Sequence, residues 1–133
     1  MHLIAALTFL LALPNMAFAQ DVDPLGQYQW HNRPLVIFAD TPDDPRFRHQ
    51  MEMLAITPDE LESRDVVILT DTDPDADGPL RQTLHPRDFM LVLIGKDGTV
   101  ALRKPFPWSV RELSRAIDKM PMRQEELRQN GNQ

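Results

Sequence analysis

Carboxylate side chains are the groups in this sequence whose type and spacing best match a known binding chemistry. Asp73, Asp75 and Asp77 alternate along the chain and Gly78 follows, as in the first six positions of an EF-hand calcium loop. The twelfth position of such a loop is a glutamate, whereas this chain has Leu84. Because Ca²⁺ prefers carboxylate oxygens, the three aspartates are a candidate calcium site. The sequence favours the other interpretation, a solvated acidic loop between a strand and a helix, since Pro74 and Pro79 also fit a calcium loop badly.

Composition excludes several other kinds of site. The chain contains no cysteine, so it has no disulfide, no thiolate nucleophile and no thiolate metal site. His31, His49 and His85 are not spaced as zinc ligands, and neither a G-x-S-x-G motif nor a P-loop occurs. The net charge of −6 argues against nucleic acid or an anionic membrane as partner, since both attract basic surfaces. We expect no cofactor.

The amino-terminal segment has the pattern of a secretory signal peptide. Residues 1–13 are almost wholly apolar, Pro14 breaks the run, and Ala17 and Ala19 form an A-x-A cleavage pattern. The run is about a dozen residues long, too short to span a bilayer. We therefore predict a signal peptide at residues 1–19, a periplasmic or extracellular location, and no membrane anchoring after cleavage. The alternative is a buried amino-terminal helix.

The rest of the chain predicts one α/β domain at residues 30–130, preceded by an arm at 20–29 and followed by a tail at 131–133. Short apolar runs rich in β-branched residues predict strands at 34–39, 66–69, 89–94 and 99–103. Asp97-Gly98 predicts a hairpin between the last two strands. Helix starts are predicted after Asp44, Thr57 and Ser109, with a helical turn at 79–84 and a short helix at 122–128.

The order of these elements predicts the topology. A right-handed crossover makes the first two strands parallel, and the hairpin adds two antiparallel strands. The result is a mixed four-stranded sheet with helices on both faces, βαβ–ββα, which is the thioredoxin arrangement.

Several segments resemble a bacterial family defined as domain of unknown function 4174. The segments that carry the resemblance are Trp30 with 33–39, Asp44-Pro45 and Gln50, then 64–67, Phe89 with 93–98, Leu102-Arg103, and 117–123. The resemblance extends over residues 25–128. It implies a thioredoxin-like or peroxiredoxin-like fold, related to domains in animal sushi-repeat and matrix-associated proteins. It implies no established activity.

The thioredoxin-like fold implied by this resemblance would place its redox motif after the first strand. A peroxiredoxin has Thr-x-x-Cys there, and this chain has Thr41 but Asp44 in place of the thiol. Pro86 and Asp88 stand near the position where such folds have a substrate-contacting proline. Thiol redox activity is therefore excluded. We predict either plain helix capping at this turn or a cleft around Thr41, Asp44, Arg87 and Asp88 that binds a basic or neutral group.

Five residues within the family motifs have two interpretations; they are Trp30, Arg33, Arg64, Asp65 and Arg123. In one, they form a binding surface for a ligand or partner, with Trp30 as its anchor and Arg33 beside it. In the other, Arg64 or Arg123 pairs with Asp65 or Asp118 and locks helices onto the sheet.

Three functional hypotheses follow. We prefer an exported, non-catalytic thioredoxin-like domain that binds a protein or a small ligand. The second is an enzyme that reuses the thioredoxin cleft through Thr41, Asp44 and Arg87. The third is a calcium-dependent structural module.

Overall fold

A computed structural model describes residues 23–132, and the predicted signal peptide at 1–19 lies outside them. The strands are β1 (Arg33–Phe38), β2 (Val66–Asp71), β3 (Met90–Ile94) and β4 (Val100–Lys104). The α-helices are α1 (Pro45–Ile56), α2 (Pro58–Glu62), α3 (Pro79–Leu84), α4 (Val110–Asp118) and α5 (Pro121–Gly131). Two 3₁₀ turns complete the chain, η1 (Gly26–Tyr28) and η2 (Pro74–Ala76).

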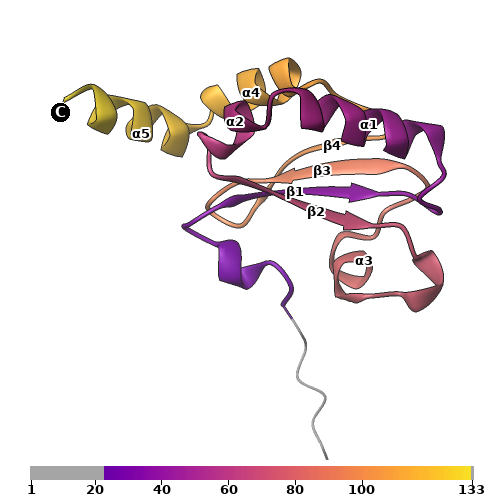
Figure 1. Ribbon diagram of the computed structural model, residues 1–133. Coiled ribbons are helices and arrows are strands. Elements are labelled where there is room, and N and C mark those ends of the chain that lie inside the picture. The colour runs from indigo at the N-terminus through magenta and orange to yellow at the C-terminus, as the bar shows by residue number, and fades with distance from the viewer. Residues whose placement is uncertain (1–22, 133) are drawn as a thin grey trace, which may run out of the picture.

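The four strands form one sheet in the order β2-β1-β3-β4 (Figure 1). β1 pairs with β2 in parallel and with β3 antiparallel, and β4 continues the hairpin. This is the predicted mixed sheet, and the parallel pairing of β1 and β2 is confirmed. β1 is buried along its whole length, because it has a strand on each side and helices on both faces.

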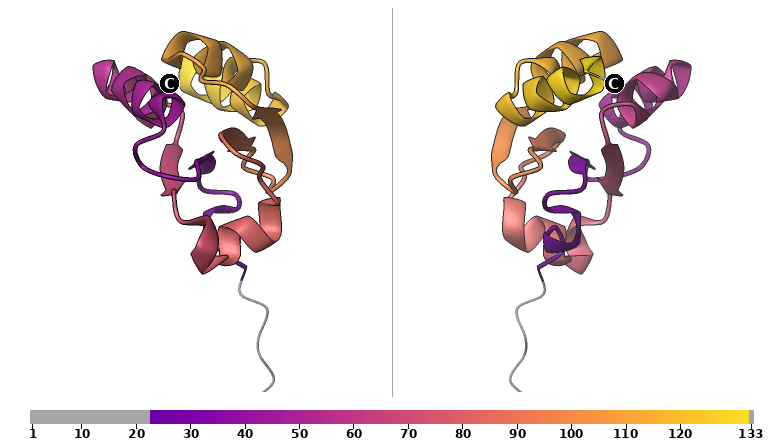
Figure 2. Two further views of the ribbon diagram at one scale, coloured as in Figure 1. Left: turned by 90° about the vertical axis from the view of Figure 1, so that its right-hand side faces the viewer. Right: turned by 90° about the vertical axis from the view of Figure 1, so that its left-hand side faces the viewer.

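The sheet separates two apolar clusters. Above it, Leu35 and Ile37 of β1 pack with Leu54 of α1, Leu61 of α2 and Leu113 of α4. Below it, the alternate β1 residues Val36 and Phe38 pack with Leu84 of α3 and with Leu25. The turned views show the sheet between these two layers of helix (Figure 2). The predicted helices on both faces are therefore confirmed.

Two of the three predicted helix caps are formed. Asp44 caps α1 and Ser109 caps α4 in a complete capping box with Glu112, as predicted. Thr57 precedes α2 but makes no side-chain capping bond, so the capping box predicted there was wrong. Thr57 is also the residue at which α1 ends. Because it ends one helix and precedes the next, its backbone (φ −134°, ψ 66°) does not adopt the extended conformation that a capping threonine usually has.

The predicted amino-terminal arm is partly folded onto the domain. η1 follows Leu25, which packs against the lower cluster, and the Gln29 amide donates to the Asp97 carbonyl at 3.0 Å. Among the described residues, no helix is both long and apolar enough to cross a bilayer.

A buried glutamine joins α1 to the segment before α4. Gln50 is fully buried; its amide nitrogen donates to the Trp108 carbonyl and its amide oxygen accepts from the Trp108 N–H, both at 2.8 Å. Trp108 lies outside the sheet and the helices, so these two bonds from Gln50 satisfy backbone groups that no strand or helix pairs. The apolar positions of α1 predict its inward face, but not this polar contact across 58 residues.

We predict that Gln50→Leu lowers the free energy of unfolding by about 2–3 kcal/mol, since leucine has similar volume but leaves both Trp108 backbone groups unpaired. Urea denaturation of the purified chain measures this. Gln27→Leu at an exposed position is the control and should change stability by less than about 0.5 kcal/mol. Equal stability of the two variants would contradict this role of Gln50.

Candidate functional site

The turn at the start of α1 contains two residues of the predicted cleft, Thr41 and Asp44. The buried Asp44 carboxylate accepts from the Arg46 N–H at 2.8 Å, which is the predicted N-cap. The Arg46 guanidinium then reaches Asp44 Oδ2 and Asp88 Oδ1, both at 2.7 Å. It also stands over the ring of Phe89, 5.6 Å from the centroid. Arg46 thus ties the loop after β1 to the start of β3.

This bridge fixes both carboxylates in their charged form. Hydrogen bonds from Arg46 hold the pKa of Asp44 and of Asp88 below the usual aspartate value, against an opposing effect of burial. A general acid or base needs a pKa near the working pH. Neither aspartate meets that requirement, so the bridge is suited to positioning rather than to proton transfer.

The other residues of the predicted cleft do not join this bridge. Thr41 is exposed, and its hydroxyl accepts from the Asp43 N–H at 3.3 Å. Arg87 is exposed beside Asp88, whose backbone adopts a left-handed conformation (φ 52°). The cation beside Asp44 and Asp88 is Arg46 and not the predicted Arg87. Arg46 follows the N-cap residue Asp44 by two positions, and its side chain folds back to contact Asp44. The sequence did not single out Arg46.

The candidate calcium site is not assembled. Among residues 23–132, no three acidic or histidine side chains gather as a metal-binding group. Pro74 starts η2, Asp73 accepts from the Ala76 N–H, and Asp77 turns into a left-handed conformation. The described residues therefore do not bring Asp73, Asp75 and Asp77 together as a metal-binding group.

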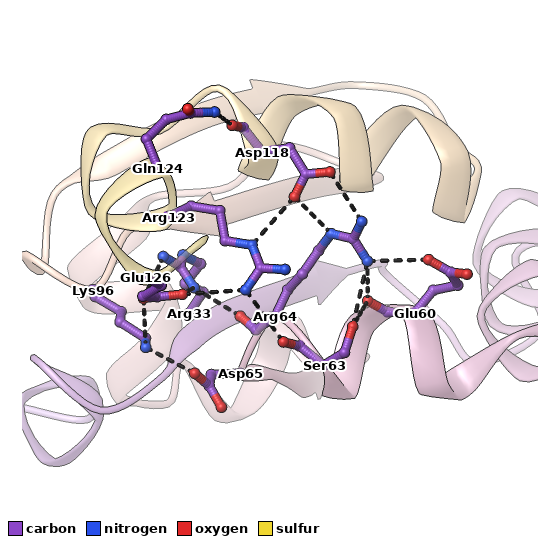
Figure 3. Close-up of polar contacts among 10 residues, drawn as sticks. All are labelled: Arg33, Glu60, Ser63, Arg64, Asp65, Lys96, Asp118, Arg123, Gln124 and Glu126. Atoms are coloured by element: carbon purple, nitrogen blue, oxygen red, sulfur yellow. Dashed lines mark hydrogen bonds and ion pairs between the residues drawn. The ribbon is translucent and has the colours of Figure 1, made fainter. Parts of the chain in front are cut away.

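A second charged cluster, which we call the Arg33 network, joins β1 to the carboxyl-terminal helices (Figure 3). The Arg33 side chain is fully buried, and its Nη2 contacts Glu126 Oε1 at 2.9 Å. Its Nη1 donates to the Arg64 carbonyl at 2.8 Å. Lys96 Nζ contacts the same Glu126 oxygen at 2.7 Å and Asp65 at 2.8 Å.

Asp118 provides the other half of the network. Arg64 forms a two-pronged contact with it, Nε to Oδ1 and Nη2 to Oδ2, both at 2.9 Å. Arg123 contacts Asp118 and Glu126, each at 3.3 Å. Arg64 and Arg123 therefore pair with Asp118 as the structural interpretation expected, while Asp65 pairs with Lys96.

The network sets the electrostatics of Glu126. Burial opposes its ionisation, but hydrogen bonds from Arg33 and Lys96 outweigh burial and lower the pKa of Glu126 from 4.5 to about 2. One donor stays unused, because Arg33 Nε is buried and has no acceptor within the described residues. An unpaired buried N–H costs about 1–3 kcal/mol.

A cavity of about 270 Å³ lies beside this network. Its walls come from the β3–β4 hairpin, from Ala101 of β4, from Met120, Pro121 and Met122 around the start of α5, and from Arg33 and Lys96. We call it the hairpin–α5 cavity. Its walls combine apolar side chains with three charged ones, Arg33, Lys96 and Asp97, and apolar walls with a few polar groups are typical of small-molecule sites.

The backbone of Trp30 contacts Lys96, one of the residues that line the hairpin–α5 cavity. Its N–H donates to the Lys96 carbonyl at 2.6 Å, and its side chain is 60% exposed. Its backbone has a φ of 71°, which a bulky residue rarely adopts. Of the residues predicted to bind, Trp30 is thus exposed beside the hairpin, and Arg33 is buried in the wall of the cavity.

Comparison with known proteins places the chain in a family. The family model described as "Domain of unknown function (DUF4174)" matches residues 24–126, and the chain belongs to this family. No curated protein matches it.

Solved structures show the fold. The reduced 2-Cys peroxiredoxin of Plasmodium vivax is similar at 15% identity with a TM-score of 0.60, over 76% of this chain and 84% of that one. A secreted disulfide oxidoreductase of Mycobacterium tuberculosis, homologous to E. coli DsbE, is 15% identical with a TM-score of 0.48, over 71% of this chain and 85% of that one. The fold is thioredoxin-like, as predicted.

We predict that Glu126→Gln lowers the free energy of unfolding at neutral pH by about 1–3 kcal/mol, since it leaves Arg33 without its counter-charge. The pKa of Glu126 lies lower in the folded chain than in the unfolded chain. Its contribution is therefore complete above pH 4.5 and is lost as the pH falls toward 2. Urea denaturation across this pH range should show the gap between wild type and variant closing.

The matched control is Glu125→Gln on the same helix. Glu125 pairs with Arg128 and accepts from the Gln129 amide at 3.4 Å, and the side chains of the ion pair are more than half exposed, so this variant should stay close to wild type. A gap for Glu126→Gln that is constant from neutral pH down to 2 would contradict the assigned charge state.

Proposed function

We propose that this DUF4174 member is an exported, non-catalytic thioredoxin-like module that binds a small ligand in the hairpin–α5 cavity. The observation that carries the proposal is the cavity itself, with apolar walls at Ala101, Met120 and Met122 beside the cations Arg33 and Lys96. Apolar walls supply affinity and a few fixed polar groups supply orientation. The two predicted binding residues with chemistry that fits this role, Trp30 and Arg33, lie at or beside this end of the domain.

The non-catalytic part of the proposal is supported by the state of the reactive position. The chain has no thiol, and Asp44 and Asp88 are both held by Arg46. An enzyme that reuses this position would have to break the bridge before either carboxylate could act. Export rests on the signal-peptide pattern of residues 1–19.

A small ligand is favoured over a protein partner by the shape of the site. Protein interfaces of standard size bury about 800 Å² on each side. The exposed apolar side chains that could serve such an interface come from different elements, for example Ile56 from α1, Ile68 from β2 and Phe106 from the segment before α4. The cavity instead has the dimensions of a ligand of about ten to fifteen non-hydrogen atoms, which would bind with a Kd of about 1 mM or better.

We expect fragments with an apolar body to bind the purified chain at this cavity. Ligand-observed and protein-observed NMR would detect them, with shifts at the Ala101 and Met122 methyl groups. Ala101→Trp, which fills the cavity, should weaken binding at least about tenfold, equivalent to about 1.4 kcal/mol.

Ala55→Trp is the control, because Ala55 is exposed on α1 and does not line the cavity. Fragment binding that is equal in the two tryptophan variants would refute the assignment to this cavity. Retention of a protein from the native envelope by wild type and Ala101→Trp, but not by Trp30→Ala, would favour a protein partner instead.

A further inference from the structure

We infer that the groove between α2 and α4 binds a phosphate group, held by the guanidinium groups of Arg111 and Arg115. The residues that line this groove are all different from those that line the hairpin–α5 cavity. It is therefore a second binding site, beyond the proposed function, and either site can fail its test without the other.

The groove is a hollow of about 350 Å³ in the layer of helices above the sheet. α2 and α4 contact each other there, and Arg64 crosses between them from Glu60 to Asp118 (Figure 3). The other residues that line the groove are Thr57, Val110, Arg111, Ser114 and Arg115. Val110 is the one apolar residue among those that line it, so the groove is suited to a polar group and not to a hydrocarbon.

Arg111 and Arg115 are four residues apart on α4, so they share the face of the helix that lines the groove. Both are exposed, and neither forms an ion pair within residues 23–132. Like charges at this spacing repel each other and destabilise a helix. A local cost that the fold itself does not offset is typical of a functional site, here one that receives a negative charge.

The acids nearest to Arg115 along α4 already have other partners. Asp118, three residues later, accepts two bonds from Arg64, both at 2.9 Å. Glu112, three residues earlier, accepts from the Ser109 N–H at 3.0 Å in the capping box that starts the helix. The helix therefore contains acids at the spacing of a salt bridge with Arg115, but the fold uses them elsewhere.

The wall of the groove has an excess of positive charge, although the chain has a net charge of −6. Three arginines line it, against two acids, Glu60 and Asp118. Arg64 pairs with both acids, at 3.0 and 2.9 Å, and Arg123 adds a second cation beside Asp118. These pairs leave the other two arginines of the wall uncompensated. The Arg33 network does not reverse this excess, because its other two cations face two acids in turn.

A phosphate group matches what these side chains offer. Near neutral pH it carries between one and two negative charges and three oxygens that accept hydrogen bonds, and arginine binds it through two parallel N–H bonds. Two uncompensated guanidinium groups balance this charge, whereas one carboxylate would leave one of them unpaired. Thr57 adds a hydroxyl to the wall, and this hydroxyl makes no capping bond to α2.

The test is a titration of the ¹⁵N-labelled full chain with inorganic phosphate at pH 8, where phosphate is mainly the dianion. We expect the amide resonances of Arg111 and Arg115 to shift and saturate with a Kd of about 1–10 mM. Sodium acetate at the same ionic strength should bind at least about tenfold more weakly, since it has half the charge. Methyl phosphate identifies the source: it should bind as tightly as phosphate if the groove takes an ester, and more weakly if it takes the free ion.

Arg115→Gln should weaken phosphate binding at least about tenfold, because it removes one of the two cations. The matched control is Arg48→Gln, which removes the same charge from an exposed arginine of α1 that does not line the groove and should leave binding unchanged. Urea denaturation distinguishes binding from a structural role. Without phosphate, Arg115→Gln should be as stable as wild type or slightly more stable, since it relieves a repulsion.

Phosphate shifts that do not saturate, or that are equal in Arg115→Gln and Arg48→Gln, would overturn the inference. A clear loss of stability in Arg115→Gln would assign this arginine a structural role and would overturn it as well. A hexaglutamate peptide that depends on Arg115 and binds more tightly than phosphate and methyl phosphate would assign the groove to an acidic protein partner instead. None of these results changes the expectation for fragments in the hairpin–α5 cavity.

Discussion

The side chain of Arg33 places a positive charge at the start of the central strand with none of its surface exposed. A buried charge is tolerated only when it is paired and hydrogen-bonded. The partners of Arg33 are the carboxylate of Glu126, 93 residues further along the chain, and the carbonyl of Arg64, just before β2.

The position of α5 depends on this pairing, because Glu126 lies on α5. α5 has no apolar face, and its only buried residue is Arg123. Its attachment to the domain is therefore electrostatic, in contrast to α1 and α4, which pack through leucines, valine and isoleucine.

The opposite end of the same strand is also held by charged side chains. A carboxylate at Asp44 caps α1, and Arg46 links it to Asp88 at the start of β3. These contacts join the two loops that a thioredoxin-like fold brings together after β1 and before β3. They do so with two carboxylates whose pKa the hydrogen bonds from Arg46 hold below the usual aspartate value. The position thus keeps a structural role in orienting the first helix.

The proposed ligand site is separated from that position by the length of β1. The hairpin–α5 cavity lies where β1 begins and where β3 ends, since these two strands are antiparallel. Arg33 and Lys96 line this cavity and also belong to the Arg33 network that holds α5. Because both cations serve the cavity wall and the attachment of α5, the helix and the cavity are physically coupled. Any group that draws on Arg33 or Lys96 also acts on Glu126, and through it on α5.

The sequence by itself determined the layers of this protein. Strands buried on both faces, the hairpin at Asp97-Gly98 and the caps at Asp44 and Ser109 depend on neighbouring residues, so they can be recognised locally, and the parallel β1–β2 pair follows from the handedness of the crossover. The sequence also named Asp118 as one of the possible partners of Arg64 and Arg123.

Only the tertiary structure decided the other contacts. These are the ion pair of Arg33 with Glu126, the reciprocal bonds of Gln50, the contact of Arg46 instead of Arg87 with the two aspartates, and the cavity beside α5. Within the described residues, the tertiary structure also did not gather Asp73, Asp75 and Asp77 into a metal-binding group, although their spacing matched a calcium loop. The reason is that spacing along a chain fixes distance in sequence, whereas a charge or an amide finds its partner by orientation and burial, which only the packed fold sets.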